Sequence, residues 1–315
     1  MHNKYIFTNV IGTFVFNEHF SLLDKRLFKN SEQYKDKTEV EKEFLKKYKN
    51  LKKPEGKELV RVLEFFKKKE WFKGFYEGNL KVTKEAIKAS VKDDLLIIQT
   101  ISNISEIDKS INTLIKRLRE WYALYNPELE NKLDNQEKFV ELIMKKSKKE
   151  LLKEIKVNEK DSMGADFSKE ELEPILSLAK EVSGLFALRG KQENYLEKLM
   201  KKVCPNVLAI TGATIGAKLI SQAGDLKRLM LFPASTIQLL GAEKALFRHM
   251  KTGARAPKFG FLHEHPLISK NPKELHGKIA RALADKISIA VKVDYFKGKF
   301  IGDKLLKEVE EKFVK

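Results

Sequence analysis

The chain has 315 residues and 42% hydrophobic content, which suits two or three domains with packed cores. No uncharged apolar stretch approaches the roughly 20 residues that cross a bilayer, and the N-terminal residues do not show the pattern of an export signal. A single cysteine excludes an internal disulfide and a thiolate metal cluster. We therefore expect a reducing, intracellular compartment.

The net charge of +18 is unevenly distributed along the chain. Residues 1–110 carry 23 basic and 17 acidic side chains, residues 111–200 carry 17 of each, and residues 201–315 carry 22 basic and 10 acidic. A generally lysine-rich proteome would explain the neutral middle, but not the scarcity of acids after residue 200. The last third is therefore expected to bind a polyanion, nucleic acid first and an anionic membrane second.

The N-terminal residues 1–93 predict a small α+β domain. Residues 4–16 are rich in β-branched and aromatic side chains and predict two strands or a hairpin around Gly12. Residues 18–53 predict one or two amphipathic helices. Residues 54–82 predict a helix, a turn at Gly74–Gly78 and a returning strand. The many phenylalanines of this domain are interpreted as core residues.

Residues 94–204 contain two long apolar repeats with 4-3 spacing. The first runs from Ile97 to Tyr125, with Asp108 as its only charge, and ends before Pro127. After a helix around 136–155 and a turn at 161–164, Ser168 and Glu171 form a predicted capping box for a second helix of about 35 residues. Two such helices predict an antiparallel coiled coil, with an ordinary helical bundle as the alternative.

Three patterns resemble catalytic or metal sites but lack essential parts. Gly212–Leu219 departs from a phosphate-binding P-loop in its glycine spacing and in the residue after lysine. Ser177–Lys180 and Lys251–Gly253 match two parts of a penicillin-binding serine signature whose third part is absent. We interpret His263, His265 and His276 as solvent-facing or RNA-stacking residues, because their spacing does not suit a metal. The sequence predicts neither a catalytic residue nor a metal site.

The basic segment from 212 to 260 mixes lysine and arginine with small residues, which suits phosphate contacts at helix ends. Pro233 predicts a helix start with Ser235 or Thr236 as its cap or as a phosphate donor. Lys244, Arg248, Lys251 and Arg255 follow at intervals of 4, 3 and 4, one cationic stripe on a helix reaching about Thr252. Taken alone, this stripe also suits an ordinary solvated face.

Several longer strings in the chain resemble the Nop domain, found in the core scaffold proteins of box C/D small ribonucleoprotein particles and in a related splicing factor. They are GATIGAKLISQAG, PASTIQLLGAEKALFRHMKTGARAPKFG and KELHGKIARALADKISIAVKVDYF, preceded by REWYALYNPEL and SMGADFS. The resemblance covers about residues 117 to 300. It implies a mainly α-helical protein with a small α+β N-terminal domain, a long antiparallel coiled coil and an all-helical Nop domain at 205–315.

The resemblance also implies partners and site residues. Its family members bind a box C/D guide RNA together with a kink-turn-binding protein of the ribosomal-protein family, hold fibrillarin through the N-terminal domain, and pair through the coiled coil. The implied RNA contacts are Lys227, Arg228, Ser235, Thr236, Lys244, Arg248, Lys251, Arg255 and Lys258. The implied contacts with the kink-turn protein are Gly241, Ala242, Glu243, Ala245 and Phe247, and those for self-association are Phe186, Leu196 and Met200.

The implied function is a scaffold, with no enzymatic activity and no cofactor, for guide-directed 2′-O-methylation of ribosomal or transfer RNA. One departure is Leu231, which stands where relatives often carry a phosphate-binding lysine. The chain ends in a short amphipathic stretch, KLLKEVEEKFVK, without a long charged tail, which indicates the archaeal form and the cytoplasm, or the nucleolus if the source is eukaryotic. A splicing factor that binds small nuclear RNA and an RNA-modifying enzyme are the alternatives.

Overall fold

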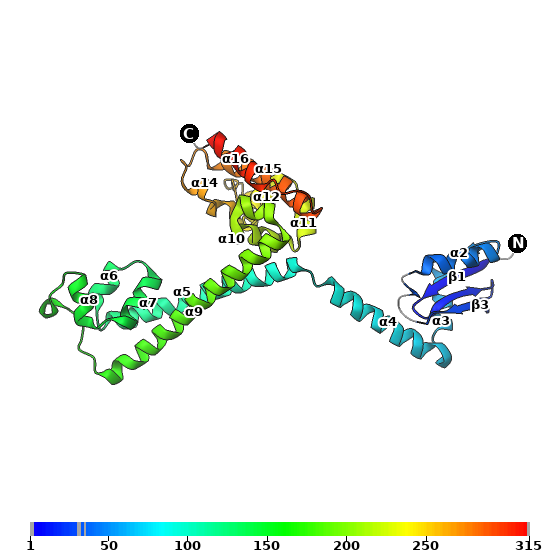
Figure 1. Ribbon diagram of the computed structural model, residues 1–315, viewed down its shortest axis with the longest axis horizontal. Coiled ribbons are helices and arrows are strands. Elements are labelled where there is room, and N and C mark those ends of the chain that lie inside the picture. Colours follow the sequence, from blue (N-terminus) through cyan, green and yellow to red (C-terminus); the bar gives the residue numbers. More distant parts are fainter. Residues whose placement is uncertain (1–2, 30–32, 35, 314–315) are drawn as a thin grey trace. The chain divides into compact units, whose positions relative to one another are not determined.

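The computed structural model describes residues 3–29, 33–34 and 36–313, in two compact units, 1–92 and 93–315 (Figure 1). Among these residues, no helix combines the length and apolarity that a membrane span requires. The predicted end of the N-terminal domain is residue 93. The predicted division at 204 and 205 does not separate compact units, because the helices on its two sides share one core.

The N-terminal unit contains a four-stranded sheet in the order β3-β2-β1-β4. Its strands are β1 (Lys4–Asn9), β2 (Gly12–Phe16), β3 (Leu22–Leu27) and β4 (Leu51–Lys52). β1 and β2 are antiparallel with Asn9 opposite Gly12, which confirms the predicted hairpin. Phe14, Phe66 and Trp71 are buried with edge-to-face ring contacts, as expected of core residues.

This unit also contains helices α2 (Lys37–Lys47), α3 (Lys57–Phe65) and α4 (Lys69–Ser90). The all-helical prediction for 18–53 was wrong at β3, which pairs with β2, and at β4, which pairs with β1. Residues 30–32 and 35 of that segment lie outside the described residues. The predicted turn and returning strand at 74–82 were also wrong, because α4 continues through both glycines. A Cβ atom on Gly78 would lie 2.8 Å from Val10 Cγ2, so this glycine lets the helix approach the β1–β2 turn.

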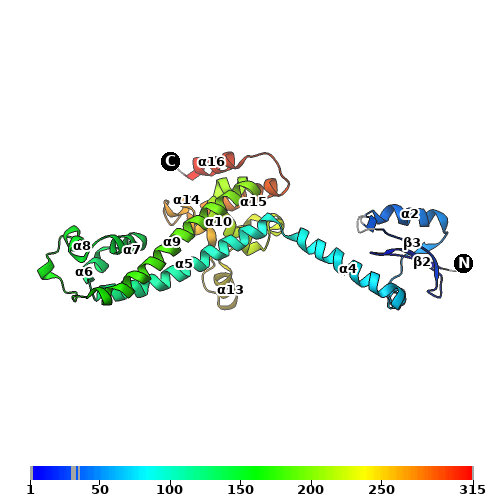
Figure 2. The ribbon, with the colours of Figure 1, turned by 60° about the horizontal axis from the view of Figure 1, so that its bottom comes forward.

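The predicted antiparallel coiled coil is formed by α5 (Asp93–Ala123) and α9 (Lys169–Val203), the long helices of Figure 2. The start of α5 packs on the end of α9 in one core cluster, and the end of α5 packs on the start of α9 in another. Between the clusters, Arg189 Nε donates to Asp108 Oδ1 at 2.6 Å. Both bonds of the Ser168–Glu171 capping box are present, as predicted.

The far end of the coiled coil is a small helical bundle rather than a bare hairpin. It contains α6 (Pro127–Lys132), α7 (Gln136–Lys145), α8 (Lys148–Glu154) and the 3-10 turn η1 (Glu159–Asp161). The single helix predicted around 136–155 is two helices, because Ser147 caps a new helix through a second capping box. Pro127 ends the apolar repeat and also begins α6, a position that proline tolerates because it needs no N–H donor there.

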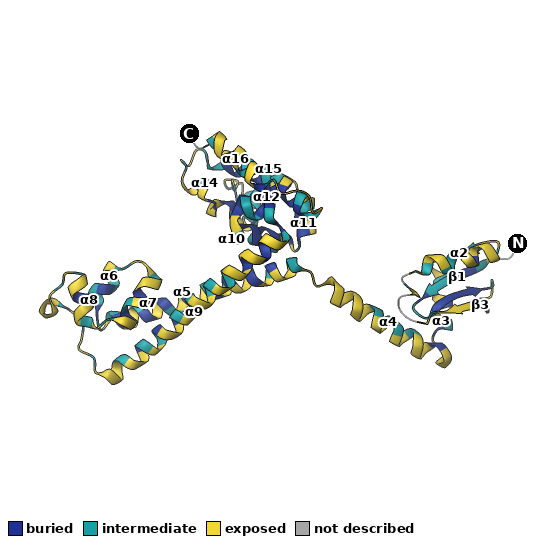
Figure 3. Cartoon of the chain, in the orientation of Figure 1, coloured by how far each residue is buried: buried dark blue, intermediate teal, exposed yellow. Residues whose placement is uncertain are grey.

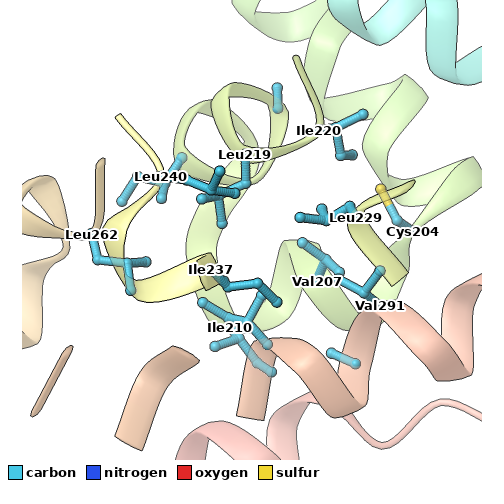
Figure 4. Packing of buried hydrophobic residues seen from close by; sticks show 14 of the residues in the cluster. Cys204, Val207, Ile210, Leu219, Ile220, Leu229, Ile237, Leu240, Leu262 and Val291 are labelled. Atoms are coloured by element: carbon cyan, nitrogen blue, oxygen red, sulfur yellow. The ribbon is translucent and has the colours of Figure 1, made fainter. Parts of the chain in front are cut away.

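Among its described residues, the C-terminal part of the second unit has helices and a 3-10 turn and no strand, as the resemblance implied. Its elements are α10 (Pro205–Ala223), α11 (Leu226–Leu231), α12 (Ala234–Leu239), α13 (Glu243–Thr252), η2 (Phe261–Glu264), α14 (Pro266–Ser269), α15 (His276–Tyr295) and α16 (Gly302–Phe313). Apolar side chains from α10, α11, α12, η2 and α15 converge on one core (Figure 4). The same cluster contains Leu196 and Met200 of α9, which joins this core to the base of the coiled coil.

A buried carboxylate fixes the beginning of α10. Asp294 of α15 accepts hydrogen bonds from the backbone N–H groups of Asn206 and Val207 and from the Asn206 amide, at 2.6 to 3.2 Å. Asn206 Oδ1 accepts in turn from the Ile301 N–H before α16. Burial raises the pKa of Asp294, and the hydrogen bonds oppose that shift. This cluster ties the start of α10 to α15 and to the segment that precedes α16.

Candidate nucleic-acid interface

Helix α13 is held away from the core by the segments that flank it. Gly260 N–H donates to Gln238 O at 2.9 Å, and Phe261 N–H donates to Leu240 O at 2.8 Å. A Cβ atom on Gly260 would lie 1.8 Å from Leu240 O, so only glycine fits this close backbone contact. These bonds join the two ends of the segment 241–259, which contains α13, and α13 projects from the packed helices (Figure 2).

One face of α13 carries the predicted cationic stripe. Lys244, Arg248 and Lys251 are exposed, and none of them makes an ion pair with a described residue. At about 100° per residue the three side chains lie within one narrow sector of the helix. No residue of α13 is buried. The stripe is therefore open to solvent, with its cationic groups available for phosphate.

An apolar surface adjoins this stripe. Phe247 is 59% exposed and Met250 is 71% exposed, and their positions place them beside the stripe rather than opposite it. The opposite side contains half-buried Leu246 and His249, whose Nδ1 contacts Ala254 O beyond the helix. An exposed aromatic and methionine pair of this kind is typical of a protein-binding surface.

The residues implied as contacts with the kink-turn protein surround the same helix start. Gly241, Ala245 and Phe247 are exposed, whereas Ala242 and Glu243 are half-buried. Glu243 Oε1 accepts the Gly241 N–H at 2.8 Å, so this carboxylate organises the entry to α13. The structure thus brings the implied protein contacts and the cationic stripe onto adjoining faces of one element.

The loop and α12 contribute the next implied RNA contacts. Arg255 and Lys258 are exposed after α13, and Lys258 O accepts from Gln238 Nε2 at 2.6 Å. Ser235 and Thr236 are exposed in the first turn of α12. The prediction that one of them caps the helix was wrong, because Pro233 occupies the cap position and no side chain bonds there. Both hydroxyls are therefore free of a capping role.

Lys227 and Arg228 lie on a different part of the surface. Their helix α11 packs on α10 and α15, and its first N–H group, at Leu226, donates to Asp94 Oδ2 at the start of α5. Both side chains are exposed, as is Leu231 at 67%. The structure does not join this pair to the stripe on α13. Lys227 and Arg228 belong to the base of the coiled coil.

A second group of cations was missed by the sequence analysis. A groove of about 1130 Å³ lies between α12, the 256–258 loop, α15 and α16, and Ser235 and Lys258 line it. Lys278 and Arg281 of α15 line the same groove. Their spacing of three residues in the GKIAR string was the available signal, since it places both on one helical face. The basic surface is therefore wider than α13.

The histidines do not form a metal site in the described part of the chain. His265 is buried, its Nε2 bonds to Ile210 O at 2.8 Å and its Nδ1 accepts from Leu267 N–H at 3.2 Å. Burial lowers the pKa of His265. The solvent-facing or RNA-stacking interpretation was wrong for His265, which satisfies a carbonyl freed by the bend of α10 at Gly212. His263 is exposed, and His276 is half-buried against Asn271 O.

Two of the residues implied in self-association lie inside the chain. Leu196 and Met200 have no exposed side-chain surface and pack in the core shared with α10. The assignment of these two as contacts between copies was therefore wrong, because the apolar repeat of α9 is used against α5 and α10. Phe186 is half-buried beside the second cluster. The large apolar residues of α9 that are exposed are Leu188 at 40% and Tyr195 at 45%.

A profile of the family described as "Nop: snoRNA binding domain, fibrillarin" matches residues 103–315. The chain belongs to the Nop family. Its Nop segment contains α13, the groove and almost all of the coiled coil. The match begins within α5 and leaves the N-terminal unit outside.

Relatives in archaea and eukaryotes support this assignment. An uncharacterized NOP5 family protein of Methanocaldococcus jannaschii is 42% identical over 258 residues, which are 77% of this chain and 62% of that protein. Nucleolar protein 56 of Dictyostelium discoideum is 42% identical over 65% of this chain and 41% of its own length. This chain thus spans less than two thirds of each relative's length. A crystal structure titled as a fibrillarin/Nop5p complex aligns over 93% of this chain and 96% of its own, at 25% identity and a TM-score of 0.47.

Proposed function

We propose that this Nop-family chain is an RNA-binding scaffold of a box C/D ribonucleoprotein, which positions fibrillarin for guide-directed 2′-O-methylation of ribosomal or transfer RNA. The RNA contacts lie on α13 and the loop that follows it. Methyl transfer belongs to fibrillarin, and this chain supplies geometry without catalytic residues or a cofactor of its own. The N-terminal unit is the proposed dock for fibrillarin.

The observation that carries the proposal is the composite surface of α13. Its exposed and unpaired stripe of Lys244, Arg248 and Lys251 suits phosphate, and the adjoining Phe247 and Met250 suit a protein. A surface with both chemistries favours a complex of RNA with a second protein over either one alone. The second protein in this proposal is the kink-turn-binding protein of the ribosomal-protein family.

The test is reconstitution with a box C/D guide RNA, the kink-turn protein and fibrillarin. The Lys244→Glu, Arg248→Glu variant is expected to lose RNA assembly by at least about 100-fold, because two phosphate contacts become repulsive, while fibrillarin binding is unchanged. Its control is Lys169→Glu, Lys201→Glu, which makes the same charge change on exposed positions of α9 away from Leu188 and Tyr195. Equal assembly by both variants would reject the proposed RNA face.

Salt dependence gives a second measure of the same interface. If about four phosphates are neutralised, log affinity falls against log salt with a slope of roughly −3. The charge-reversal variant of α13 is expected to flatten this slope, and the α9 control is not. Purified protein alone is expected to transfer no methyl group from S-adenosylmethionine. Robust transfer without fibrillarin would favour the RNA-modifying enzyme instead.

We also propose that two copies pair through the coiled coil. The contacts between copies then involve exposed residues of α9 rather than the buried Leu196 and Met200. Leu188 and Tyr195 are seven residues apart and share one exposed side of α9, as an intermolecular seam requires. Lysine at both positions is expected to produce a monomer by analytical ultracentrifugation without loss of helix content. A wild type that is monomeric at micromolar concentration would contradict pairing.

In this proposal the cellular compartment depends on the source organism. It is the cytoplasm if the chain is archaeal and the nucleolus if it is eukaryotic.

The second candidate function within the family is that of a splicing factor that binds small nuclear RNA. The match to NOP5 and nucleolar protein 56 relatives favours the box C/D role. Comparing affinities for a guide RNA and a small nuclear RNA, each with the kink-turn protein present, distinguishes the two.

A further inference from the structure

The groove beside α12 and α15 contains charged groups of both signs that are left without partners. Lys258, Lys278, Arg281 and Lys312 supply cations, and Glu274 and Asp285 supply carboxylates. Within the described residues, none of these six side chains makes an ion pair or a hydrogen bond. Arg281 and Asp285 are four residues apart on α15, so an ion pair along this helix was available and is not formed.

The groove also has apolar and aromatic lining residues. Leu239, Pro257 and Ala282 line it from three different elements, and the half-buried Phe313 of α16 is part of the lining. Gly277 contributes no side chain on the α15 side, where an added Cβ would lie 3.5 Å from Lys258 Cδ, an ordinary contact distance. An apolar recess bordered by a few polar groups is the usual form of a small-ligand site.

The two signs of charge narrow the class of ligand. A simple anion would be repelled by Glu274 and Asp285, and a simple cation by the four basic groups. A nucleotide carries both complements: a phosphate for lysine and arginine, and a base whose exocyclic amino group donates to a carboxylate. Its flat base also suits an apolar recess with an aromatic side chain, as in the recognition of unstacked RNA bases.

We propose that this groove receives one unpaired RNA nucleotide whose base has an exocyclic amino group, with its base in the recess and its phosphate on Lys278 and Arg281. The proposal rests on the proposed RNA-binding function, since Ser235 and Lys258 lie both in the groove and among the implied RNA contacts. It adds base selectivity to a surface that otherwise reads only phosphate. Glu274 and Asp285 discriminate against uridine, which presents carbonyl groups where adenosine and cytidine present an amino group.

Short single-stranded RNA tests the groove without the other components. The full chain is titrated with the tetranucleotides A4, C4 and U4 and with an abasic tetramer, by fluorescence anisotropy at low salt. Wild type is expected to bind A4 and C4 about 10-fold more tightly than U4 or the abasic tetramer. Glu274→Gln, Asp285→Asn is expected to remove that preference, and Lys278→Gln, Arg281→Gln to weaken all four probes.

Two further variants make the result specific. Gly277→Leu fills the recess and is expected to reduce A4 and C4 to the abasic level. The Lys292→Gln, Lys299→Gln variant is the control: it removes two positive charges outside the groove, one on α15 and one after it. It is expected to leave the base preference intact. Thermal melts check that each variant is folded. A tetramer of 5-iodocytidine is expected to crosslink at Phe313 under ultraviolet light, and a crosslink confined to α13 would count against the groove.

Equal affinity of wild type for all four tetramers, or unchanged affinities in every groove variant, would overturn the proposal. The latter result would also be the outcome if the groove holds a peptide of a protein partner. Failure here is distinguishable from failure of the proposed function. Loss of assembly in the α13 charge reversal, with no effect of the groove variants, rejects the groove and leaves the scaffold role standing.

Discussion

The helices α9 and α13 use similar spacing for opposite purposes. Along α9, apolar residues at intervals of three and four form a seam that is buried against α5 and α10. Along α13, cationic residues at the same intervals form a stripe that remains exposed. Burial follows the chemistry of the repeating residues rather than the spacing, as the colouring of α9 in Figure 3 illustrates. One helix contributes stability and the other is left free for a partner.

The largest expected difference is in the free energy of unfolding, between alanine substitutions of a large side chain on α9 and on α13. Leu196→Ala is expected to lower the free energy of unfolding by about 3 kcal/mol, because it removes a fully buried side chain and leaves a cavity. Phe247→Ala, at 59% exposure, is expected to change it by less than about 0.5 kcal/mol while weakening binding of the kink-turn protein. Urea unfolding measures the first effect, and comparable losses at both sites would break the comparison.

Alanine substitutions at two glycines, Gly260 and Gly190, are expected to change stability in opposite directions. Gly260→Ala is expected to cost about 2 kcal/mol and to weaken RNA assembly, because its Cβ would overlap Leu240 O and displace the support of α13. Gly190→Ala meets nothing within 4 Å on α9 and is expected to stabilise by about 0.5 kcal/mol. Thermal denaturation with an RNA assembly assay separates the two, and unimpaired assembly of Gly260→Ala would contradict the proposed support.

The two arginines test whether pairing matters on an exposed helix face. Arg189 bonds to Asp108 and Glu193, with 39% of its side chain exposed, so Arg189→Ala is expected to cost at most about 1 kcal/mol. Arg248→Ala has no described pair to break and is expected to affect RNA binding alone. A double-mutant cycle with Asp108→Ala measures the coupling, and a value well above 1 kcal/mol would show that the seam depends on this pair.

The smallest expected effect on stability comes from the capping of the N-termini of α9 and α13. A hydrogen bond from the Ser168 N–H lowers the pKa of Glu171, whereas α13 has no side-chain cap. A depressed pKa contributes stability above the pKa of the unfolded chain, and this is lost as pH falls through the folded value. Glu171→Gln is therefore expected to reduce the steepness of acid destabilisation between about pH 5 and 3. Unfolding by urea across this range measures it, and an unchanged steepness would contradict the assignment.

Local chemistry explains which predictions from the sequence succeeded. The capping box at Ser168, the hairpin around Gly12 and the long apolar repeats were predicted correctly, because each depends on residues near one another in the chain. The strand at 22–27 was missed, since its charged residues Asp24, Lys25 and Arg26 have no clear alternation and become a strand by pairing with β2. The glycines of α4 suggested a turn, but they serve packing against the hairpin.

The same division applies to the candidate site. The sequence by itself determined the basic balance of the last third, the spacing of the stripe on α13 and membership of the Nop family, because these are properties of order along the chain. Only the tertiary structure decided that Leu196 and Met200 are internal, that His265 is buried, and that Lys278 and Arg281 share a groove with Lys258. Each of these facts depends on which segments, distant in the sequence, pack against one another. That packing sets how far a side chain is buried and which charges surround it.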